Sequence, residues 1–347
     1  MHRFYKLTVL RIERLTSVSV KITFDLPELL QKEFAFEAGM YLTLQQTINN
    51  QKVRRAYSIC SATNEKELSI AVKKVPNGIF SAYLTTELKK GDILEVMPPE
   101  GIFVFLPYLF NDKDIILFSA GSGVTPMMSI AKTALAETDV KVVFVYGNKT
   151  KEETLFLDEI EKLQKLYPNR FFVHYVFSQQ KWNNHFSGRI DEHIIAFIFK
   201  KYGYFNLGRY YICGPNTMVS SVKKNLLERG IASEYIFTEL FEATAVPVND
   251  VSALQGSVRI TYIIDRKETT FESSKSKSLL TSILSQGVDV PYSCLNGVCS
   301  SCIGKIIEGQ AQMVKNETLV DKEIKEGYVL TCQAHPITDF IKITYDV

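Results

Sequence analysis

The sequence predicts a chain of several domains: an antiparallel β-barrel, an α/β domain with a doubly wound parallel sheet, and a small cysteine-bearing domain at the end. Three observations support this prediction. Residues 1–107 carry short alternating segments between turn signals, residues 108–241 alternate buried-type strands with helical stretches, and residues 257–347 hold three cysteines within nine positions. At roughly 150 residues per domain, the 347 residues suffice for two to three domains.

The first domain is expected to be mostly β. Its segments alternate apolar and polar residues and recur at a spacing typical of an antiparallel barrel. One helix interrupts them at residues 79–88 and ends at Lys89, Lys90 and Gly91, in the order expected of a helix C-terminus. The expected strands are residues 7–12, 18–24, 41–45, 68–73 and 93–97.

The second domain is expected to be a doubly wound α/β fold, because continuous apolar runs alternate with helical stretches. The expected strands are residues 115–119, 142–146, 171–177 and 210–213, and the expected helices are residues 127–136, 152–166 and 217–229. Residues 242–256 show no periodicity and are dominated by small and turn-forming residues. We therefore expect a linker there, ahead of the last domain.

Composition excludes several function classes. Lys and Arg number 40 against 38 Asp and Glu, and 22% of the residues are charged. This balance fits neither a disordered acidic chain nor a polybasic arm, so we expect no nucleic-acid partner. The first ten residues hold no signal-peptide core, and the longest apolar runs, 102–110 and 194–199, are far shorter than the ~18–20 residues that cross a bilayer. We therefore expect a cytoplasmic protein without a membrane span.

The last domain carries the strongest motif. Cys294, Cys299, Cys302 and Cys332 are separated by four, two and 29 residues, the plant-type spacing for a 2Fe-2S cluster. Three ligands within nine residues would point successive sulfurs and backbone N–H groups inward around the two irons. A structural zinc site is the alternative, but zinc modules usually pair two short cysteine knuckles, whereas Cys332 stands alone. A disulfide pair is disfavoured because no secretion signal is visible.

Around these cysteines the sequence resembles the plant-type ferredoxin family. Residues 291–305 (Pro-Tyr-Ser-Cys-Leu-Asn-Gly-Val-Cys-Ser-Ser-Cys-Ile-Gly-Lys) and 329–334 (Val-Leu-Thr-Cys-Gln-Ala) match its two signature stretches. The resemblance implies a β-grasp fold that holds a 2Fe-2S cluster. One departure is Leu295, where photosynthetic members usually carry a basic residue.

Two stretches of the first domain suit a flavin nucleotide. Arg55, Tyr57 and Ser58 supply a cation, an aromatic ring and a hydroxyl in consecutive reach. An exposed arginine beside a strand tyrosine is the plain alternative. Further on, Gly78 lets the backbone approach a ligand, and Ser81 stands at a helix N-terminus whose free N–H groups favour an anion. The candidate residues are Arg55, Ala56, Tyr57, Ser58, Val72, Lys73, Gly78 and Ser81.

These stretches resemble the FAD-binding barrel of the ferredoxin-NADP reductase superfamily, over about residues 1–105. The resemblance implies that Arg55 binds the FAD pyrophosphate and that Tyr57 packs on the isoalloxazine. It also implies that Ser58 approaches the flavin N5 and that Ser81 contacts phosphate.

The second domain offers a phosphate-type turn. Residues 121–126 (Gly-Ser-Gly-Val-Thr-Pro) lie between a predicted strand and a helix, and proline in the first helical turn leaves N–H groups for a pyrophosphate. A plain strand-to-helix turn is the alternative. Residues 213–215 (Cys-Gly-Pro) end the last predicted parallel strand, where ligands bind in such sheets. The candidate residues are Gly121, Gly123, Thr125, Pro126, Cys213, Gly214 and Pro215.

The Cys-Gly-Pro run matches a signature of the same superfamily. By that resemblance, Cys213 and Thr125 border the nicotinamide where hydride passes to FAD. Glu239 then lies near the flavin and Phe241 covers its open face. The expected catalytic residues are therefore Ser58, Cys213 and Glu239.

The choice of nicotinamide cofactor depends on the residues after the second parallel strand. NAD sites often place a carboxylate there for the ribose hydroxyls. In this chain Asn148, Lys149, Thr150 and Lys151 follow instead, and two lysines with a threonine suit a 2′-phosphate. The sequence favours NADP(H), with NAD(H) left open, since a solvated lysine pair at a loop tip is common.

The domain order is similar to that of the reductase components of multicomponent oxygenases, most of all the reductase subunits of phenylacetyl-CoA epoxidases. The resemblance implies an NAD(P)H-dependent oxidoreductase that passes electrons through FAD and a 2Fe-2S cluster, one at a time, to an oxygenase component, here a diiron enzyme. A stand-alone NAD(P)H oxidase or ferric or quinone reductase would use the same residues without a protein partner, and the reductase of another oxygenase or of a desaturase would use them with a different partner. A non-catalytic redox carrier or sensor would keep the cluster alone.

Overall fold

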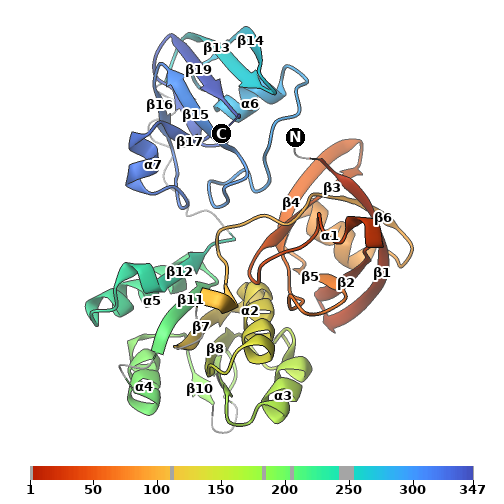
Figure 1. Ribbon diagram of the computed structural model, residues 1–347, viewed down its shortest axis with the longest axis vertical. Helices are drawn as coiled ribbons and strands as arrows, with labels where there is room; N and C mark the ends of the chain where they lie inside the picture. Colours follow the sequence, from red (N-terminus) through yellow and green to blue (C-terminus); the bar gives the residue numbers. More distant parts are fainter. Residues whose placement is uncertain (1–2, 110–112, 182–184, 204–206, 242–253, 347) are drawn as a thin grey trace. The chain divides into compact units, whose positions relative to one another are not determined.

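The computed structural model describes residues 3–109, 113–181, 185–203, 207–241 and 254–346 (Figure 1). The chain divides into two compact units, one formed by Phe4–Phe241 and the other by Glu242–Val347 with Met1–Arg3. The linker expected at residues 242–256 lies outside the described residues except for its last three. Within the described residues, no helix is both long and apolar enough to cross a membrane.

The first part of the larger unit is an antiparallel barrel. Its six strands follow the order β4-β3-β6-β1-β2-β5, and an isolated bridge between Ile59 and Ile70 joins the two edges. Asn49 and Asn50 both adopt left-handed φ, of 50° and 60°, which is the geometry of the two-residue turn that closes the β3–β4 hairpin. The elements are β1 (Tyr5–Thr16), β2 (Ser19–Asp25), η1 (Glu28–Leu30), β3 (Tyr41–Ile48), β4 (Gln51–Ser58), β5 (Leu68–Lys73), α1 (Ile79–Thr86), β6 (Ile93–Val96) and η2 (Pro107–Leu109).

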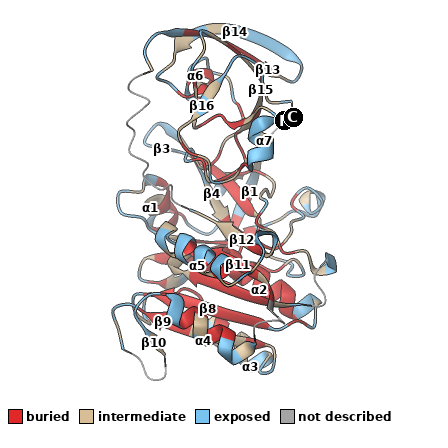
Figure 2. Ribbon diagram, turned by 90° about the vertical axis from the view of Figure 1, so that its left-hand side faces the viewer, coloured by how far each residue is buried: buried red, intermediate tan, exposed pale blue. Residues whose placement is uncertain are grey.

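The second part is a parallel sheet in the order β10-β9-β8-β7-β11-β12. Helices α2 and α3 cover one face and α4 and α5 the other, so the central strands β7 and β8 are buried between them (Figure 2). The elements are β7 (Asp114–Ala120), η3 (Gly121–Gly123), α2 (Val124–Glu137), β8 (Val142–Asn148), α3 (Leu157–Leu166), β9 (Phe171–Phe177), β10 (Phe186–Ser187), α4 (Glu192–Tyr202), β11 (Leu207–Cys213), α5 (Asn216–Glu228), η4 (Ser233–Tyr235) and β12 (Ile236–Glu239).

Two elements of this sheet differ from expectation. The helix expected from residue 152 begins only at Leu157, because Phe156 adopts a left-handed φ of 59° and residues before it form turns. Helix α4 was not expected, since residues 194–199 stand out only as an apolar run. Asp191 caps α4 by accepting bonds from the backbone N–H groups of His193 and Ile194.

Helix α2 lies between the sheet and the barrel. Its residues from Val124 to Leu135 are all buried, the polar ones included. One apolar core joins α2 to Ala38, Phe103 and Phe105, which belong to the barrel and the segment that follows it. The two parts therefore form one unit, and the boundary expected between residues 107 and 108 stays a prediction.

The smaller unit holds a five-stranded mixed sheet in the order β14-β13-β19-β15-β17, with β13 and β19 parallel. Helix α6 packs on this sheet around a core of its own, the arrangement of the expected β-grasp fold. The elements are β13 (Ser257–Ile264), β14 (Lys267–Ser274), α6 (Leu279–Leu284), β15 (Ile303–Glu308), β16 (Ala311–Met313), α7 (Asp321–Lys325), β17 (Tyr328–Leu330), β18 (Ala334–Pro336) and β19 (Phe340–Thr344).

Candidate functional site

The parallel sheet has a switch point between β7 and β11, where the strand order reverses. Ligands of open α/β sheets bind at the carboxyl ends of the strands beside such a point. The turn after β7 and the end of β11 touch there, since a Cβ added to Gly123 would lie 2.2 Å from the carbonyl oxygen of Cys213. Gly121 has a left-handed φ of 56°, and the hydroxyl of Thr125 donates to the Ser122 carbonyl at 3.1 Å.

Three side chains expected to be catalytic converge at this edge. Ser58 ends β4 of the barrel, Cys213 ends β11 and Glu239 ends β12. The Ser58 hydroxyl donates to Glu239 Oε2 at 3.3 Å, and the Cys213 thiol donates to the same oxygen at 3.9 Å. The fold thus joins residues 181 positions apart. Their roles toward the cofactors stay predictions.

Burial sets the protonation of this group. It raises the pKa of Glu239 to about 8, although the bonds from Ser58 and Cys213 act in the opposite direction. Burial, with the Glu239 carboxyl beside it, raises the pKa of Cys213 well above its usual value. At neutral pH the three groups are therefore mostly uncharged, and the thiol is not a reactive nucleophile.

The flavin candidates lie along β4 and the start of α1. Arg55 is exposed and its Nη1 donates to the Arg54 carbonyl at 2.6 Å. The half-buried ring of Tyr57 packs edge-to-face on Phe80, with the centroids 6.1 Å apart. Ala56, on the same strand, is also half-buried. An exposed cation two residues from a partly covered ring suits a diphosphate and a planar ring system.

Three other flavin candidates have partners inside the protein. The Ser81 hydroxyl accepts from the Val75 N–H at 3.1 Å and donates to the Gly78 carbonyl at 3.3 Å, so it closes its own turn. Val72 is 1% exposed and lies in the barrel core, which leaves only its backbone for a ligand. Lys73 pairs with Glu153 at 3.5 Å.

The nucleotide candidates at the end of β8 are a buried amide and an exposed cation. Asn148 is buried, and its side chain hydrogen-bonds to the Tyr146 hydroxyl. Lys149, the next residue, is exposed. These observations fit a dinucleotide that extends from the Gly121 turn across the edge of the sheet.

The remaining candidates flank β11 and β12. A Cβ on Gly214 would lie 2.7 Å from Met218 Cε and 3.1 Å from the Ala120 nitrogen, so this backbone is closely packed. Pro215 is exposed, and Phe241 is 37% exposed. Pro126 lies in the first turn of α2, as expected.

The four cysteines of the smaller unit form two pairs. Cys294 interacts with Cys299 through their side chains, and Cys302 interacts with Cys332 in the same way. The hydrogen bond from Cys299 and the nearby backbone N–H groups lower the pKa of Cys294 to about 6. One of these N–H groups belongs to Asn296, 3.4 Å from Cys294 Sγ. These contacts favour the thiolate of Cys294, while the same contact raises the pKa of Cys299.

This pairwise arrangement fits a two-iron cluster. A lone zinc ion needs four ligands around one point, whereas a 2Fe-2S cluster takes two cysteines on each iron. Thr331 fixes the second pair, because its N–H and hydroxyl both donate to the Cys302 carbonyl, at 3.0 and 2.9 Å.

Sequence reasoning missed one residue near the site. Lys132 is a charged residue inside the buried stretch of α2, and its side chain is 8% exposed. Its spacing in the sequence could have revealed it. Lys132 lies four residues after Met128 and three before Leu135, which places it on the apolar side of the helix. A lysine placed there must have ionic partners.

Three known families match successive parts of the chain. Residues 6–105 match the oxidoreductase FAD-binding domain and residues 117–224 match the oxidoreductase NAD-binding domain. Residues 262–336 match the 2Fe-2S iron-sulfur cluster binding domain, and this range contains all four cysteines of the motif.

Curated relatives align over the whole chain. One subunit of the 1,2-phenylacetyl-CoA epoxidase of Escherichia coli (strain K12) is 33% identical over 100% of this chain and 99% of its own length. The ferredoxin reductase component of 3-ketosteroid-9-alpha-monooxygenase from Rhodococcus rhodochrous is 31% identical over 98% of this chain and 96% of its own. Among solved structures, phthalate dioxygenase reductase superposes with a TM-score of 0.65 at 24% identity, over 98% of each chain.

Proposed function

The chain belongs to the family of oxygenase reductases that combine an FAD-binding, an NAD-binding and a 2Fe-2S domain, and on this premise we propose that it delivers electrons from NADPH to an oxygenase component. The single observation that best supports this is the meeting of Ser58 from the barrel with Cys213 and Glu239 from the α/β domain. A flavin bound to the barrel and a nicotinamide bound at the switch point would face each other there.

Ser58, Cys213 and Glu239 would form an uncharged surface between the bound flavin and the bound nicotinamide. Ser58 and Cys213 both donate to Glu239, which keeps the carboxyl directed along the boundary. FAD and the 2Fe-2S cluster, when bound, supply the conversion from a two-electron donor to one-electron carriers. Arg55 and the backbone N–H groups at the start of α2 supply positive ends for the phosphates of the two nucleotides.

We propose a preference for NADPH that depends on Lys149. Its exposed ammonium follows Asn148 at the carboxyl end of β8, where the ribose of a dinucleotide would lie. A charge-assisted bond of about 1.5–3 kcal/mol corresponds to roughly ten- to a hundredfold in affinity. Lys149→Ala should lower the ratio of kcat/KM for NADPH over NADH by about tenfold, while Lys162→Ala, on the exposed side of α3, leaves it unchanged. An unchanged ratio in Lys149→Ala would show that the 2′-phosphate is bound elsewhere.

We further propose a partner of the same kind as that of its epoxidase relative, a diiron oxygenase that acts on a coenzyme A thioester. The support is the 33% identity to the 1,2-phenylacetyl-CoA epoxidase component, over nearly the whole length of both chains. A cytoplasmic location, expected from the sequence, is part of this proposal.

One experiment tests the electron path. The purified protein is mixed with NADPH without oxygen, and the absorbance of flavin and cluster is followed; both should bleach. Adding a candidate diiron oxygenase component should then speed NADPH oxidation and yield oxidised substrate. Rapid turnover on ferric or quinone acceptors with no response to the oxygenase indicates a stand-alone reductase, and no oxidation of NADPH or NADH indicates a carrier or sensor.

A further inference from the structure

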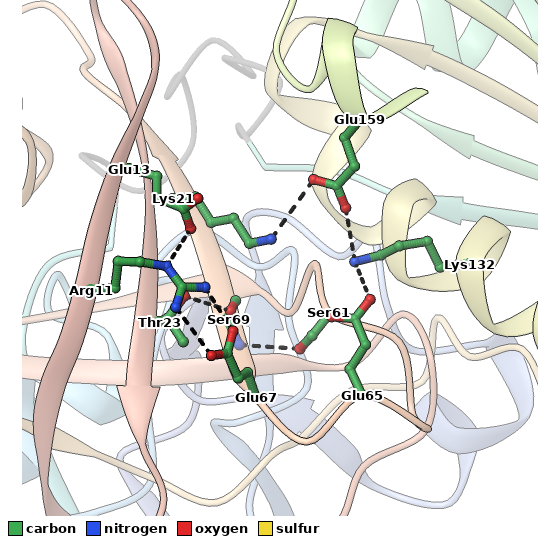
Figure 3. Close-up of polar contacts among 10 residues, drawn as sticks. All are labelled: Arg11, Glu13, Lys21, Thr23, Ser61, Glu65, Glu67, Ser69, Lys132 and Glu159. Carbon is green, nitrogen blue, oxygen red and sulfur yellow. Dashed lines mark hydrogen bonds and ion pairs between the residues drawn. The ribbon is translucent and has the colours of Figure 1, made fainter. Parts of the chain in front are cut away.

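Lys132 of α2 bridges two carboxylates at the boundary between the barrel and the α/β domain. Its Nζ lies 2.7 Å from Glu65 Oε1 and 3.2 Å from Glu159 Oε1 (Figure 3). Glu65 belongs to the barrel, in the loop between β4 and β5, whereas Glu159 belongs to α3. A nearly buried ammonium between two carboxylates fixes the relative position of the charges, whereas the apolar packing around it is non-directional.

The contact continues back into the barrel. Lys21 of β2 approaches Glu159 Oε2 at 3.7 Å, and Figure 3 shows Glu159 between the two ammonium groups. The four residues Glu65, Lys132, Glu159 and Lys21, here called the interdomain ion chain, thus begin and end in the barrel. With two cations and two anions the chain has no net charge, so its effect is local.

Lys132 remains charged in this position. Burial alone lowers the pKa of its ammonium, but the charges of Glu159 and Glu65, with Cys60 nearby, outweigh burial and raise the pKa above its usual value. Glu65 and Glu159 keep 37% and 31% of their side chains exposed, which reduces the cost of bringing the charges together.

The apolar part of this boundary does not need the ion chain for cohesion. Cys60, Ala71 and Phe103 pack in one core with residues of α2. Such packing is strong but does not select one register between the two parts, whereas paired charges do. A second polar contact lies one residue further along α2, where Thr63 N–H and hydroxyl reach Thr133 Oγ1 at 3.2 and 3.3 Å.

Glu65 and Lys132 are both close in sequence to residues of the candidate site. Glu65 is seven residues after Ser58, and Lys132 is seven residues after Thr125 along one continuous helix. The seven residues from Thr125 to Lys132 make about two helical turns, so the two residues lie roughly 10 Å apart along α2. The first turn of α2 follows Gly123, which lies against the Cys213 backbone. A shift at Lys132 is therefore passed to the positions of Ser58 and Cys213.

We infer that Lys132 is a positioning residue, which holds the nucleotide-binding edge of the sheet in register with the flavin-binding barrel through the interdomain ion chain. The inference rests on the proposed function, because it concerns the distance over which hydride passes between the two bound rings. Misplacement by about 1 Å can slow such a step by roughly a hundredfold without abolishing binding.

The test is anaerobic single-turnover reduction of the full-length, FAD-loaded protein by saturating NADPH. Lys132→Met, which keeps the length of the side chain and removes the charge, should lower the limiting rate per bound FAD by about ten- to a hundredfold. FAD content and the Kd for NADP+ should change by less than about threefold, and the absorbance band of stacked nicotinamide and flavin should weaken. Lys224→Met is the control, since Lys224 pairs with Glu228 at 3.7 Å on the exposed side of α5.

Glu65→Gln is a second variant that changes only a partly exposed loop side chain. It should slow the limiting rate by about three- to tenfold and have no further effect in the Lys132→Met background, because the two residues act as one unit. Unchanged rates in both variants would overturn the inference, as would a loss of rate that only mirrors a loss of FAD. If the unaltered protein is not reduced by NADPH or NADH, the proposed function itself fails.

Discussion

At the scale of single residues, Glu239 shows how surroundings decide chemistry. A glutamate on an open surface is ionised at neutral pH, but burial between two domains raises its pKa to about 8. The hydroxyl of Ser58 and the thiol of Cys213 both donate to one of its oxygens. Nothing within a few residues of Glu239 in the chain indicates this environment.

Glu239 also predicts a pH dependence of stability. The folded protein keeps a proton on Glu239 that the unfolded chain loses above its ordinary pKa of 4.5, so stability falls as the pH rises from there to about 8. Glu239→Gln removes this ionisation, and the thermal midpoint of the variant should fall less than that of the unaltered protein over the same range. Glu234→Gln, on the exposed turn before β12, is the control. Parallel curves for all three proteins would contradict the assignment.

The cluster cysteines give a second prediction at this scale. Cys302→Ala leaves Cys332 without its paired thiol and should abolish binding of the 2Fe-2S cluster. Cys60→Ala removes a buried cysteine of the larger unit and should keep the full iron content. Iron analysis and visible absorbance check both variants. Equal iron in the two would rule out the four-cysteine site.

At the scale of elements, α2 combines three tasks. Its first turn follows the phosphate-type turn, its apolar residues pack on the sheet and the barrel, and Lys132 joins the interdomain ion chain. This explains why a helix of the α/β domain is buried on nearly all sides. A helix on the outer face of such a sheet normally keeps one polar side in water.

At the start of α2, we expect alanine substitutions at Gly123 and Gly121 to differ in their effect on stability and on NADP+ binding. A Cβ at Gly123 would lie 2.2 Å from the carbonyl oxygen of Cys213, and because that oxygen belongs to the backbone, Gly123→Ala must displace β11 or the helix. Gly121 has open space around its Cβ position, and Gly121→Ala costs only about 1–2 kcal/mol for its left-handed φ. Gly123→Ala should therefore lower the thermal midpoint and weaken NADP+ binding more. Titration and melting curves check this order, and the reverse order would contradict it.

At the scale of the whole molecule, the two units have separate cores. Among the residues that the structure describes, the core of the smaller unit draws on residues 258–345, and the cores of the larger unit draw on residues 5–240.

Separate cores predict that the larger unit folds alone. A chain ending at residue 241 should bind FAD and reduce ferricyanide with NADPH at close to the rate of the full protein, because its cores and site are complete. It should contain no iron and fail to reduce the oxygenase. The measurements are FAD content, iron content and the two reductase assays. A truncated chain that cannot bind FAD would show that the smaller unit contributes to the fold of the larger.

Several features were predictable from sequence because the residues that define them are close together in the chain. The cysteine spacing indicated a 2Fe-2S domain, which the family match over residues 262–336 confirms. The strand-to-helix turn expected at residues 121–126 lies between β7 and the first turn of α2. Other features were not. The Ser81 hydroxyl proved to close its own turn, and α3 begins after the left-handed Phe156 rather than at residue 152. Helix α4 was missed because its apolar run is short and its N-cap at Asp191 was not recognised.

The sequence by itself determined the three kinds of domain and their order, because these depend on periodicity and on groups a few residues apart. Only the tertiary structure decided that Ser58, Cys213 and Glu239 share hydrogen bonds, that Glu239 is mostly protonated at neutral pH, and that Lys132 joins the two parts of the larger unit. These facts depend on the distances between residues that are far apart in the chain and on the exclusion of water where those residues pack. A local sequence pattern contains information on neither.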